Sequence, residues 1–499
     1  MAKTYTIAHI ASEVEPFSKT GGLANVLGSL PKMHKELGSD VIIITPFYEK
    51  VIDPEEFALE SSFESLGESE FIEVTEGVWE EVSYLKVISD NIPVYFVQSD
   101  KFFGKQYERP YGFENDNARF MFYNVAALHL LKKIVFKPHI IHCHDWHSGL
   151  VPYFLKGRYK KDPFWEGTAT LFTIHNLTYQ YGHNWWEEAS DNRDDGRSSL
   201  PPFNDGEHLE RVNFAKRAIM NADAINAVSE TYREEIMTKD FGQELHRILK
   251  NREKIVFGIV NGIDYNEFNP MTDPGLEKHY SEKSVFLKKT NKKWLQKYYK
   301  LQVDPEVPLL CMTSRITEQK GFRLLVNVIR LLLKMNVQLI VMGDGDEKII
   351  SFLQKIQKEF PKQFVVMPFD HQKETMVYAA SDIFLLPSRF EPCGINQMIA
   401  LRYGCIPVVH YIGGLADTIT DYDPRRKTGN GFTFQRYGAV SLLVAITRAV
   451  ETYKHKRTWK ELVISSLREA NSWLIPALKY LDLYETTVKL KKRTKTKDK

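Results

Sequence analysis

Short apolar runs alternate with longer amphipathic stretches along most of this chain. In the second half the runs are nearly continuous and lie at residues 308–313, 337–342, 364–368, 382–386 and 405–409. The first half shows the same alternation, with runs at residues 5–12, 41–45, 140–144, 168–174, 223–228 and 254–260. Continuous apolar strands separated by helices are typical of parallel sheets covered on both faces. The pattern predicts an α/β protein with two doubly wound, Rossmann-like domains facing each other across a cleft.

A polar segment marks the predicted boundary between the two domains. Residues 261–305 are rich in Lys, Asn, Pro and Asp and contain no clear strand. We therefore expect Rossmann-like domains over 1–260 and 306–473, joined by an interdomain connection over 261–305. Beyond them we expect a helix over 474–488, packed back on the N-terminal domain. Residues 489–499 contain seven basic residues and one Asp, which predicts a disordered basic tail.

The first apolar run leads into a turn that contains two glycines. Lys19-Thr-Gly-Gly22 follows the run, and apolar residues then recur at helical spacing as far as Gly38, with a kink expected at Pro31. This is a βαβ unit whose turn carries a lysine, and we predict that the turn binds an anion. It is not a P-loop, because the sequence lacks Gly-x-x-x-x-Gly-Lys-Ser/Thr.

A second candidate loop joins the run that ends at Pro387 to a helix that starts near Ile395. Glu391 lies in this loop, where we expect it beside free backbone N–H groups at the carboxyl end of a strand. Open α/β sheets hold their ligands at that edge. Taken alone, the stretch is equally consistent with an ordinary strand-to-helix turn.

Both loops belong to a series of motifs that resembles the bacterial glycogen synthases and plant starch synthases. The motifs follow the family's order over nearly the whole chain: Lys19-Thr-Gly-Gly-Leu-Ala-Asn25, His142-Cys-His-Asp-Trp-His147, Thr173-Ile-His-Asn176, Asn261-Gly-Ile-Asp264, Ser314-Arg-Ile-Thr-Glu-Gln-Lys320, Glu391-Pro-Cys-Gly394 and Gly413-Gly-Leu-Ala-Asp-Thr418. The resemblance implies a two-domain GT-B fold. It also implies a retaining hexosyltransferase that moves glucose from ADP-glucose or UDP-glucose to an α-1,4-glucan such as glycogen or starch.

The resemblance implies catalytic roles for five residues. Glu391 would bind the donor glucose and stabilise positive charge at its anomeric carbon. His175 would contact the transferred sugar, and Lys19 would reach the phosphates or the glucose. Arg315 and Lys320 would hold the leaving diphosphate, because fixed cations can replace a metal ion there. We therefore predict catalysis without a metal or other cofactor.

The remaining predicted site residues also come from the resemblance. Besides Lys19, Arg315, Lys320 and Glu391, the donor would contact Gly21, Gly22, Asn25, Asn176, Asn261, Gly343, Gly345, Cys393, Gly394, Gly413 and Gly414. The acceptor would contact Asp145, Trp146 and His147, and the indole ring would suit stacking on a glucose ring.

Two clusters invite a metal interpretation. His142, His144 and His147 lie within six positions, but a strand end directs alternate side chains to opposite faces, which disfavours a zinc site. Asp344-Gly-Asp346 is similar to the metal-binding Asp-x-Asp of single-domain glycosyltransferases. It stands where the resembled family has a glycine-rich loop near the nucleotide, so we expect the glycines to be the working residues.

Three positions depart from the family. Asn25 replaces a usual Asp, Phe369 lies near a usual Tyr, and Ile412 replaces a usual Thr. If the family Asp stabilises the transition state, Asn25→Asp should raise turnover, although Glu391 lies in the same pocket by the family pattern. Two alternatives stay open: a glucan-binding or regulatory protein with a decayed site, and a related retaining transferase that uses a smaller acceptor.

Composition adds an expected location. The four cysteines form no Cys-x-x-Cys pair, which favours a reducing compartment, and the first apolar run starts too early to leave room for a signal peptide. We predict a cytoplasmic protein that binds neither nucleic acid nor membranes. Weak binding of nucleic acid or of an anionic surface by the basic tail is the alternative. The polar insertion at 185–206 is interpreted as a lid or a surface loop.

Overall fold

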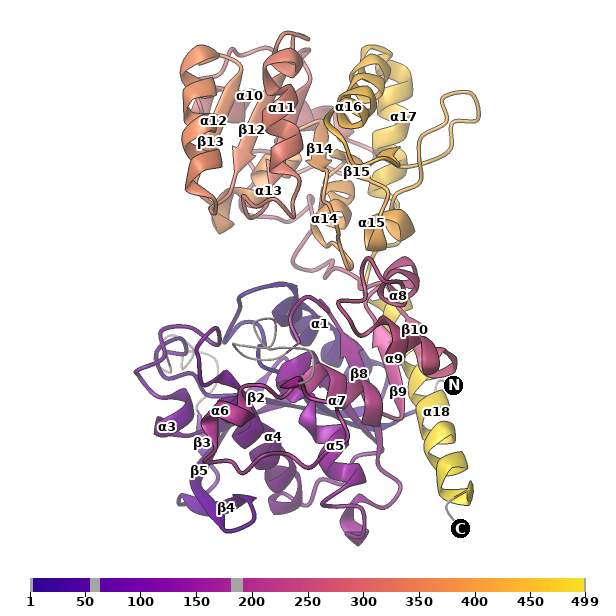
Figure 1. Cartoon of the computed structure of the whole chain (residues 1–499). Coiled ribbons are helices and arrows are strands. Elements are labelled where there is room, and N and C mark those ends of the chain that lie inside the picture. The colour runs from indigo at the N-terminus through magenta and orange to yellow at the C-terminus, as the bar shows by residue number, and fades with distance from the viewer. Residues whose placement is uncertain (1–2, 54–62, 181–191, 498–499) are drawn as a thin grey trace. The chain divides into compact units, whose positions relative to one another are not determined.

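The computed structural model describes residues 3–53, 63–180 and 192–497, which form two compact units (Figure 1). Unit 1 contains the residues up to Val228, Arg233–Ile259 and the stretch from Trp473 onward. Unit 2 contains Ser229–Tyr232 and Val260–Ser472.

Unit 1 is built on a ten-stranded mixed sheet in the order β10-β9-β8-β7-β1-β2-β6-β5-β3, with β4 paired to β5. The strands from β10 to β6 in this order pair in parallel, whereas β5 pairs antiparallel with β3, β4 and β6. The strands are β1 Thr6–Ile10, β2 Asp40–Pro46, β3 Glu64–Ser65, β4 Glu70–Thr75, β5 Val78–Ser89, β6 Ile92–Gln98, β7 Ile140–His144, β8 Ala169–Ile174, β9 Ala224–Ala227 and β10 Val256–Gly258.

The helices of unit 1 place apolar faces on this sheet. Helix α1 buries Leu23, Val26 and Leu30 and continues without a break through Pro31. The last helix, α18, contacts α1 and β8 and is yellow in Figure 1. The helices are α1 Gly22–Glu36, α3 Asp100–Phe103, α4 Asp116–Lys133, α5 Leu150–Lys156, α6 Gly206–Leu209, α7 Phe214–Asn221, α9 His246–Asn251 and α18 Leu474–Lys497, while α8 Glu230–Ile236 crosses the division between the units.

Unit 2 is a six-stranded parallel sheet in the order β13-β12-β11-β14-β15-β16. Every residue of its four central strands is buried, as their continuous apolar sequences require. The strands are β11 Leu309–Thr313, β12 Gln338–Met342, β13 Phe364–Met367, β14 Ile383–Leu386, β15 Ile406–His410 and β16 Phe432–Phe434. The helices are α10 Lys288–Tyr298, α11 Phe322–Leu333, α12 Glu347–Glu359, α13 His371–Ala380, α14 Asn396–Arg402, α15 Gly413–Thr418, α16 Ala439–Lys454 and α17 Lys456–Leu467.

The predicted strands are confirmed, because each apolar run coincides with a strand to within two residues at either end. The sequence did not predict the short β16 or the strands from β3 to β6. In β6 every second residue is buried over most of its length, the pattern of a strand with one partly exposed face.

Two predictions about the rest of the chain are corrected. The tail expected to be disordered from residue 489 instead continues α18 to Lys497, since no Gly or Pro interrupts it after Pro476 and Lys489 pairs with Glu485 at 2.7 Å. Residues 261–305, expected as a connection, belong to unit 2 and include α10.

Part of the insertion predicted at 185–206 falls outside the described residues. Its described part contains Asp194, which forms a buried ion pair with Arg217 at 2.6 Å.

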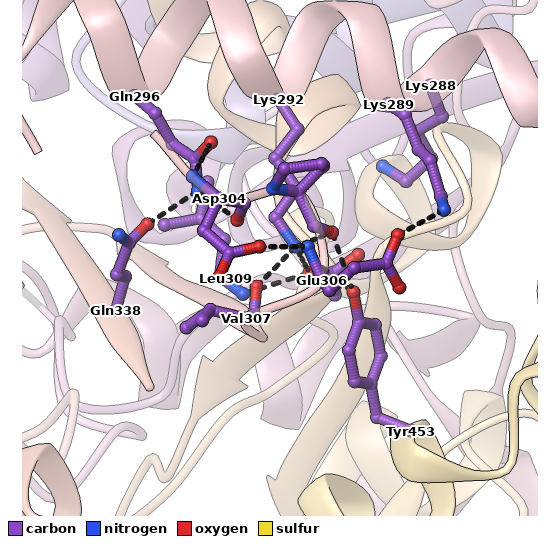
Figure 2. A network of polar contacts seen from close by, with 12 residues as sticks. Lys288, Lys289, Lys292, Gln296, Asp304, Glu306, Val307, Leu309, Gln338 and Tyr453 are labelled. Atoms are coloured by element: carbon purple, nitrogen blue, oxygen red, sulfur yellow. Dashed lines mark hydrogen bonds and ion pairs between the residues drawn. The ribbon is translucent and has the colours of Figure 1, made fainter. Parts of the chain in front are cut away.

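A buried lysine ties α10 to the rest of unit 2 (Figure 2). The Lys292 ammonium donates to Asp382 Oδ2 at 2.6 Å, to the Pro305 carbonyl at 3.1 Å and to the Tyr453 hydroxyl at 3.1 Å. The same Asp382 oxygen accepts from the Leu309 backbone N–H at 2.8 Å, at the start of β11. A buried ammonium needs such hydrogen-bond partners, because it has no contact with water. The polar residues of α10 therefore include one that attaches the helix to the sheet.

Candidate active site

The predicted site residues of unit 1 lie in three loops at one edge of its sheet, apart from Gly22 and Asn25, which lie in the first turns of α1. Strands β1, β7 and β8 are neighbours and parallel, so the loops that follow Ile10, His144 and Ile174 emerge side by side. We call residues 11–21 the first-strand loop. The carboxyl edge of a parallel sheet is where α/β proteins hold ligands.

A buried carboxylate holds the glycine turn of the first-strand loop from inside. Glu13, 1% exposed, accepts hydrogen bonds from the Thr20 hydroxyl at 2.6 Å, from the Thr20 backbone N–H and from the Gly21 backbone N–H at 3.3 Å. The Tyr111 hydroxyl donates to the same carboxylate. The N–H groups of Thr20 and Gly21 are thus bound within the chain, and anion binding by this turn stays a prediction.

Lys19 and Asn25 both contact Glu15. The Lys19 ammonium donates to Glu15 Oε1 at 2.9 Å, and the Asn25 amide donates to Glu15 Oε2 at 2.8 Å. Glu15 is thus the carboxylate next to Asn25 within unit 1. The side chains of Lys19 and Glu15 are 34% and 30% exposed, so ligand groups can reach both.

Asp145 organises the loop that carries His175 and Asn176. Its Oδ1 accepts the backbone N–H of His175 at 2.7 Å and that of Asn176 at 3.4 Å, and its own backbone has a positive φ of 55°. Burial raises the pKa of Asp145 to about 7, and the nearby charge of Glu13 adds to this rise. This carboxylate, predicted to contact the acceptor, is engaged in fixing the position of His175.

A chain of hydrogen-bonded imidazoles leads to His175. His175 Nε2 lies 3.1 Å from His144 Nδ1, and His144 Nε2 lies 3.0 Å from His9 Nδ1. Burial lowers the pKa of His175 to about 3 and lowers the pKa values of His144 and His9 well below the usual range. Each neutral ring donates through one nitrogen and accepts through the other, so the chain couples the tautomer of His175 to those of its neighbours.

His9, His142 and His144 are the one trio of described residues with ligand atoms close enough to hold a metal ion. The prediction that the strand would direct the histidines to opposite faces is wrong for His142 and His144, because residues two positions apart share a face and their ring centroids are 4.0 Å apart. Their nitrogens are largely committed to other partners. His142 contacts the Tyr484 hydroxyl at 2.9 Å and the Thr173 hydroxyl at 2.7 Å, and both nitrogens of His144 contact other imidazoles. Only Nε2 of His9 is without a partner within this trio. The geometry therefore fits a hydrogen-bond network better than a metal site.

Trp146 and His147 are buried in unit 1. Trp146 is 4% exposed and packs against Phe120 and Phe214, and His147 is 3% exposed and packs against Tyr111. The aromatic surface expected to stack on an acceptor sugar is thus covered by protein, because the short helical turn after Asp145 directs both rings into the core.

In unit 2, Glu391 and Lys320 form a buried ion pair. The Lys320 ammonium donates to Glu391 Oε2 at 2.6 Å, and their side chains are 17% and 8% exposed. The Ser388 hydroxyl donates to the same oxygen at 2.8 Å. Lys320 follows β11 and Glu391 follows β14, which are neighbouring parallel strands. The fold thus joins two predicted catalytic residues that lie 71 positions apart.

Glycines let the loops of unit 2 approach one another. A Cβ at Gly343 would lie 2.0 Å from the Ser314 carbonyl oxygen, one at Gly345 2.3 Å from that of Ile316, and one at Gly414 2.0 Å from that of Cys393. Gly394 and Gly413 have positive φ angles of 71° and 47°. The protein itself therefore requires glycine at these five predicted positions.

The other predicted residues of unit 2 differ in exposure. Arg315 is exposed, and no bond to its guanidinium is found in the described part of the chain. Asn261 is buried. Burial also raises the pKa of the Cys393 thiol to about 12, so this thiol stays protonated near neutral pH and is not a thiolate nucleophile. Asp344 accepts the Phe369 backbone N–H at 3.2 Å, and Asp346 caps α12, so both carboxylates serve the backbone.

Sequence reasoning missed several residues that support the predicted ones, namely Glu13, Glu15, Tyr111, His9 and Ser388. Glu13 and Glu15 carried a usable signal, because both are carboxylates in a loop that follows a strand. No local pattern connects Tyr111 or His9 with the site, since their partners lie 98 and 135 positions away.

Comparisons with known proteins cover both units. Residues 6–251 match a family model described as the starch synthase catalytic domain, and residues 277–463 match one described as glycosyl transferases group 1. The chain is 40% identical over 493 residues to a protein named glycogen synthase from Geotalea daltonii, covering 98% of this chain and 100% of that one. A protein of the same name from Clostridium perfringens is 39% identical over 495 residues, covering 98% and 99%.

Solved structures show the same similarity. The catalytic domain of starch synthase IV from Arabidopsis thaliana, bound to ADP and acarbose, has a TM-score of 0.85 and 31% sequence identity, covering 98% of this chain and all of that one. Sucrose-phosphate synthase from Thermosynechococcus elongatus, with a TM-score of 0.59, 17% identity and coverage of 96% and 98%, shares the fold alone.

Proposed function

Because this chain belongs to the family of bacterial glycogen synthases and plant starch synthases, we propose that it transfers glucose from ADP-glucose to the non-reducing end of an α-1,4-glucan with retention of configuration. The names of the relatives support the glucan as acceptor. ADP in the starch synthase structure supports ADP-glucose over UDP-glucose as donor.

The observation that carries the chemical part of this proposal is the buried pair of Lys320 and Glu391. Glu391 is paired with Lys320 in a site of low exposure, where its carboxylate can stabilise the positive charge that develops at the anomeric carbon. Lys320 lies beside it and can neutralise the diphosphate as it leaves. Arg315, exposed on the same loop, supplies a second cation for the phosphates.

His175 serves as an uncharged hydrogen-bonding group for the transferred sugar. Asp145 fixes the His175 backbone by accepting its N–H, and His144 fixes the ring through a hydrogen bond between its Nδ1 and the Nε2 of His175. A neutral imidazole can bind a sugar hydroxyl without adding positive charge beside the transferred sugar. Fixed cations take the place of a metal in this scheme, so no cofactor is needed.

The test is a transfer assay with each labelled sugar nucleotide. ADP-glucose and UDP-glucose are incubated with glycogen, with a sugar phosphate as a small acceptor, and without acceptor, and the products are separated by size. We expect label in glycogen from ADP-glucose, and transfer slower by about a hundredfold or more with Glu391→Gln in parallel. Label in the small acceptor alone would support the related transferase, and binding of glycogen without transfer from either donor would support a glucan-binding protein.

Two features of the chain relate to its predicted location. No helix in the described ranges is long and apolar enough to cross a membrane. The four cysteines are free and buried. A cytoplasmic location and the absence of nucleic-acid and membrane binding remain predictions.

A further inference from the structure

The first-strand loop carries two carboxylates with different surroundings. Glu13 is 1% exposed and bound to the backbone of the glycine turn. The Glu15 side chain is 30% exposed, and its two oxygens contact two side chains that the family pattern assigns to the donor, Lys19 and Asn25. Glu15 is therefore the accessible negative charge of this loop.

Helix α1 is shaped to receive Glu15. The Glu15 backbone N–H donates to the Ala24 carbonyl at 3.3 Å, which holds the loop against the first turn of the helix. Gly28, one turn after Ala24, leaves space at the same place, because a Cβ there would lie 3.2 Å from Glu15 Cβ. Glu15 thus lies over the helix surface next to Asn25, in a position built into the fold.

This arrangement accounts for the asparagine at position 25. The Asn25 amide nitrogen donates to Glu15 Oε2 at 2.8 Å. An aspartate at position 25 would have no proton to donate and would place two negative charges in contact. With Glu15 present, an amide satisfies the contact, and the pair carries one negative charge in all.

We propose that Glu15 is a positioning residue for the donor sugar, supplying from position 15 the negative charge that the family pattern places at position 25, and fixing both Lys19 and Asn25. This inference rests on the proposed function for the identity of the ligand, a hexose with its hydroxyl groups. Under this proposal Glu15 supplies the charge that Asn25 lacks, so the asparagine does not imply that the site has lost its activity. It also reverses the expectation from sequence that Asn25→Asp raises turnover.

The test is a charge exchange between the two positions. Glu15→Gln keeps the shape and an oxygen for Lys19 but removes the charge, and we expect turnover to fall roughly tenfold. Asn25→Asp brings two carboxylates together, and we expect a fall of similar size and a lower unfolding temperature. In Glu15→Gln/Asn25→Asp the amide and the carboxylate exchange places, and we expect turnover to recover to within a few fold of the wild type.

A matched control removes a similar ion pair elsewhere in unit 1. Glu207 pairs with Arg211 at 2.7 Å with the same spacing of four residues, outside the three site loops. Glu207→Gln should leave turnover unchanged. Turnover of Glu15→Gln equal to the wild type, or a double variant no better than the worse single variant, would overturn the proposal.

A second measurement separates this inference from the proposed function. If the wild type transfers no glucose, the proposed function fails, and the unfolding temperatures of the four proteins still test the contact. We expect Asn25→Asp to be the least stable of them and the double variant to regain stability. Equal unfolding temperatures for Asn25→Asp and the wild type would show that positions 15 and 25 do not interact.

Discussion

Each unit holds one lysine–carboxylate pair at its candidate site, and the two pairs differ in burial. In unit 1, Lys19 and Glu15 are 2.9 Å apart, with side chains 34% and 30% exposed. In unit 2, Lys320 and Glu391 are 2.6 Å apart, with side chains 17% and 8% exposed. An exposed pair typically contributes about 0–1 kcal/mol to stability, whereas loss of one partner of a buried pair costs about 3–5 kcal/mol.

The difference in burial indicates that a lysine ammonium and a glutamate carboxylate have different roles in the two units. The pair of unit 2 is held in place by burial and by the Ser388 hydroxyl, which suits a charge that must not move during the reaction. The pair of unit 1 shares its carboxylate with a neutral amide and stays open to ligands. Variants of the two pairs should therefore affect activity and stability in different proportions.

The largest effect is expected for Glu391→Gln. Loss of one preorganised charge in a site of low exposure is worth roughly 3 kcal/mol, or about a hundredfold or more in turnover. The fold should be preserved, because the glutamine amide oxygen can still accept from Ser388. Turnover and circular dichroism are measured beside Glu461→Gln, which removes the exposed pair with Lys427. Turnover near the wild-type value in a folded variant would exclude Glu391 from the mechanism.

Lys320→Ala and Arg315→Ala should separate catalysis from stability within unit 2. Each variant loses one cation for the diphosphate, and we expect turnover to fall about tenfold or more in each. Only Lys320→Ala leaves the buried Glu391 without its ion partner, so it alone should lower the unfolding temperature clearly. Equal unfolding temperatures of the two variants would show that the pair contributes no stability.

His144→Phe tests the chain of neutral imidazoles that leads to His175 in unit 1. The change removes the hydrogen bond to His175 Nε2 and leaves the tautomer of His175 unset. We expect turnover to fall roughly tenfold with a small change in KM, because the ring is then misplaced in the transition state. Nitrogen chemical shifts of labelled histidines should show a mixed tautomer at His175. An unchanged tautomer would contradict the proposed chain of imidazoles.

Asp145→Asn should change how stability depends on pH. The pKa of Asp145 is raised in the folded protein to about 7, so the folded state binds the proton more tightly than the unfolded state. The protonated Asp145 carboxyl therefore contributes to the free energy of unfolding. This contribution is fully present below the pKa of the unfolded state, near pH 4, and is lost as the pH rises toward about 7. The unfolding temperature of the wild type, relative to Asp145→Asn, should therefore decrease over this range. A constant difference would show that Asp145 does not titrate there.

The smallest effect is expected from removal of metal ions. Because Arg315 and Lys320 supply fixed positive charge, transfer should persist in excess EDTA at the untreated rate. Activity is compared with and without added Mg²⁺ or Mn²⁺ after chelation. An absolute requirement for either ion would return Asp344 and Asp346 to consideration as ligands, although both now bond to backbone N–H groups.

Much of the fold could be predicted because buried parallel strands have a local signature. The runs at 140–144 and 382–386 are apolar apart from two histidines in the first and Asp382 at the start of the second, and each contains a strand. Strands β3, β4 and β5 were missed because they are partly exposed and charged residues interrupt their apolar positions, whereas the mostly apolar β6 did have a local signature. The helix from 489 to 497 was missed because charge was given more weight than helix propensity.

The site could be predicted only in part, for a related reason. The motifs predicted roles for Lys19, Glu391 and Lys320, each in a loop that follows a strand, and these roles stay predictions. The motifs did not show that Glu13 occupies the N–H groups of the glycine turn, or that Trp146 is buried. A motif specifies which residue types are present, whereas burial depends on everything that packs around them.

The sequence by itself determined the order of strands and loops, and with it the edge of each sheet where the chemistry lies. That information is local, since a buried strand and the loop after it are read from adjacent residues. Only the tertiary structure decided which side chains meet, such as Glu15 with Asn25 and His9 with His144. Such contacts depend on strand register and on the path of a loop to within a fraction of an ångström. Hydrogen bonds form only within that tolerance, which no pattern of residue types specifies.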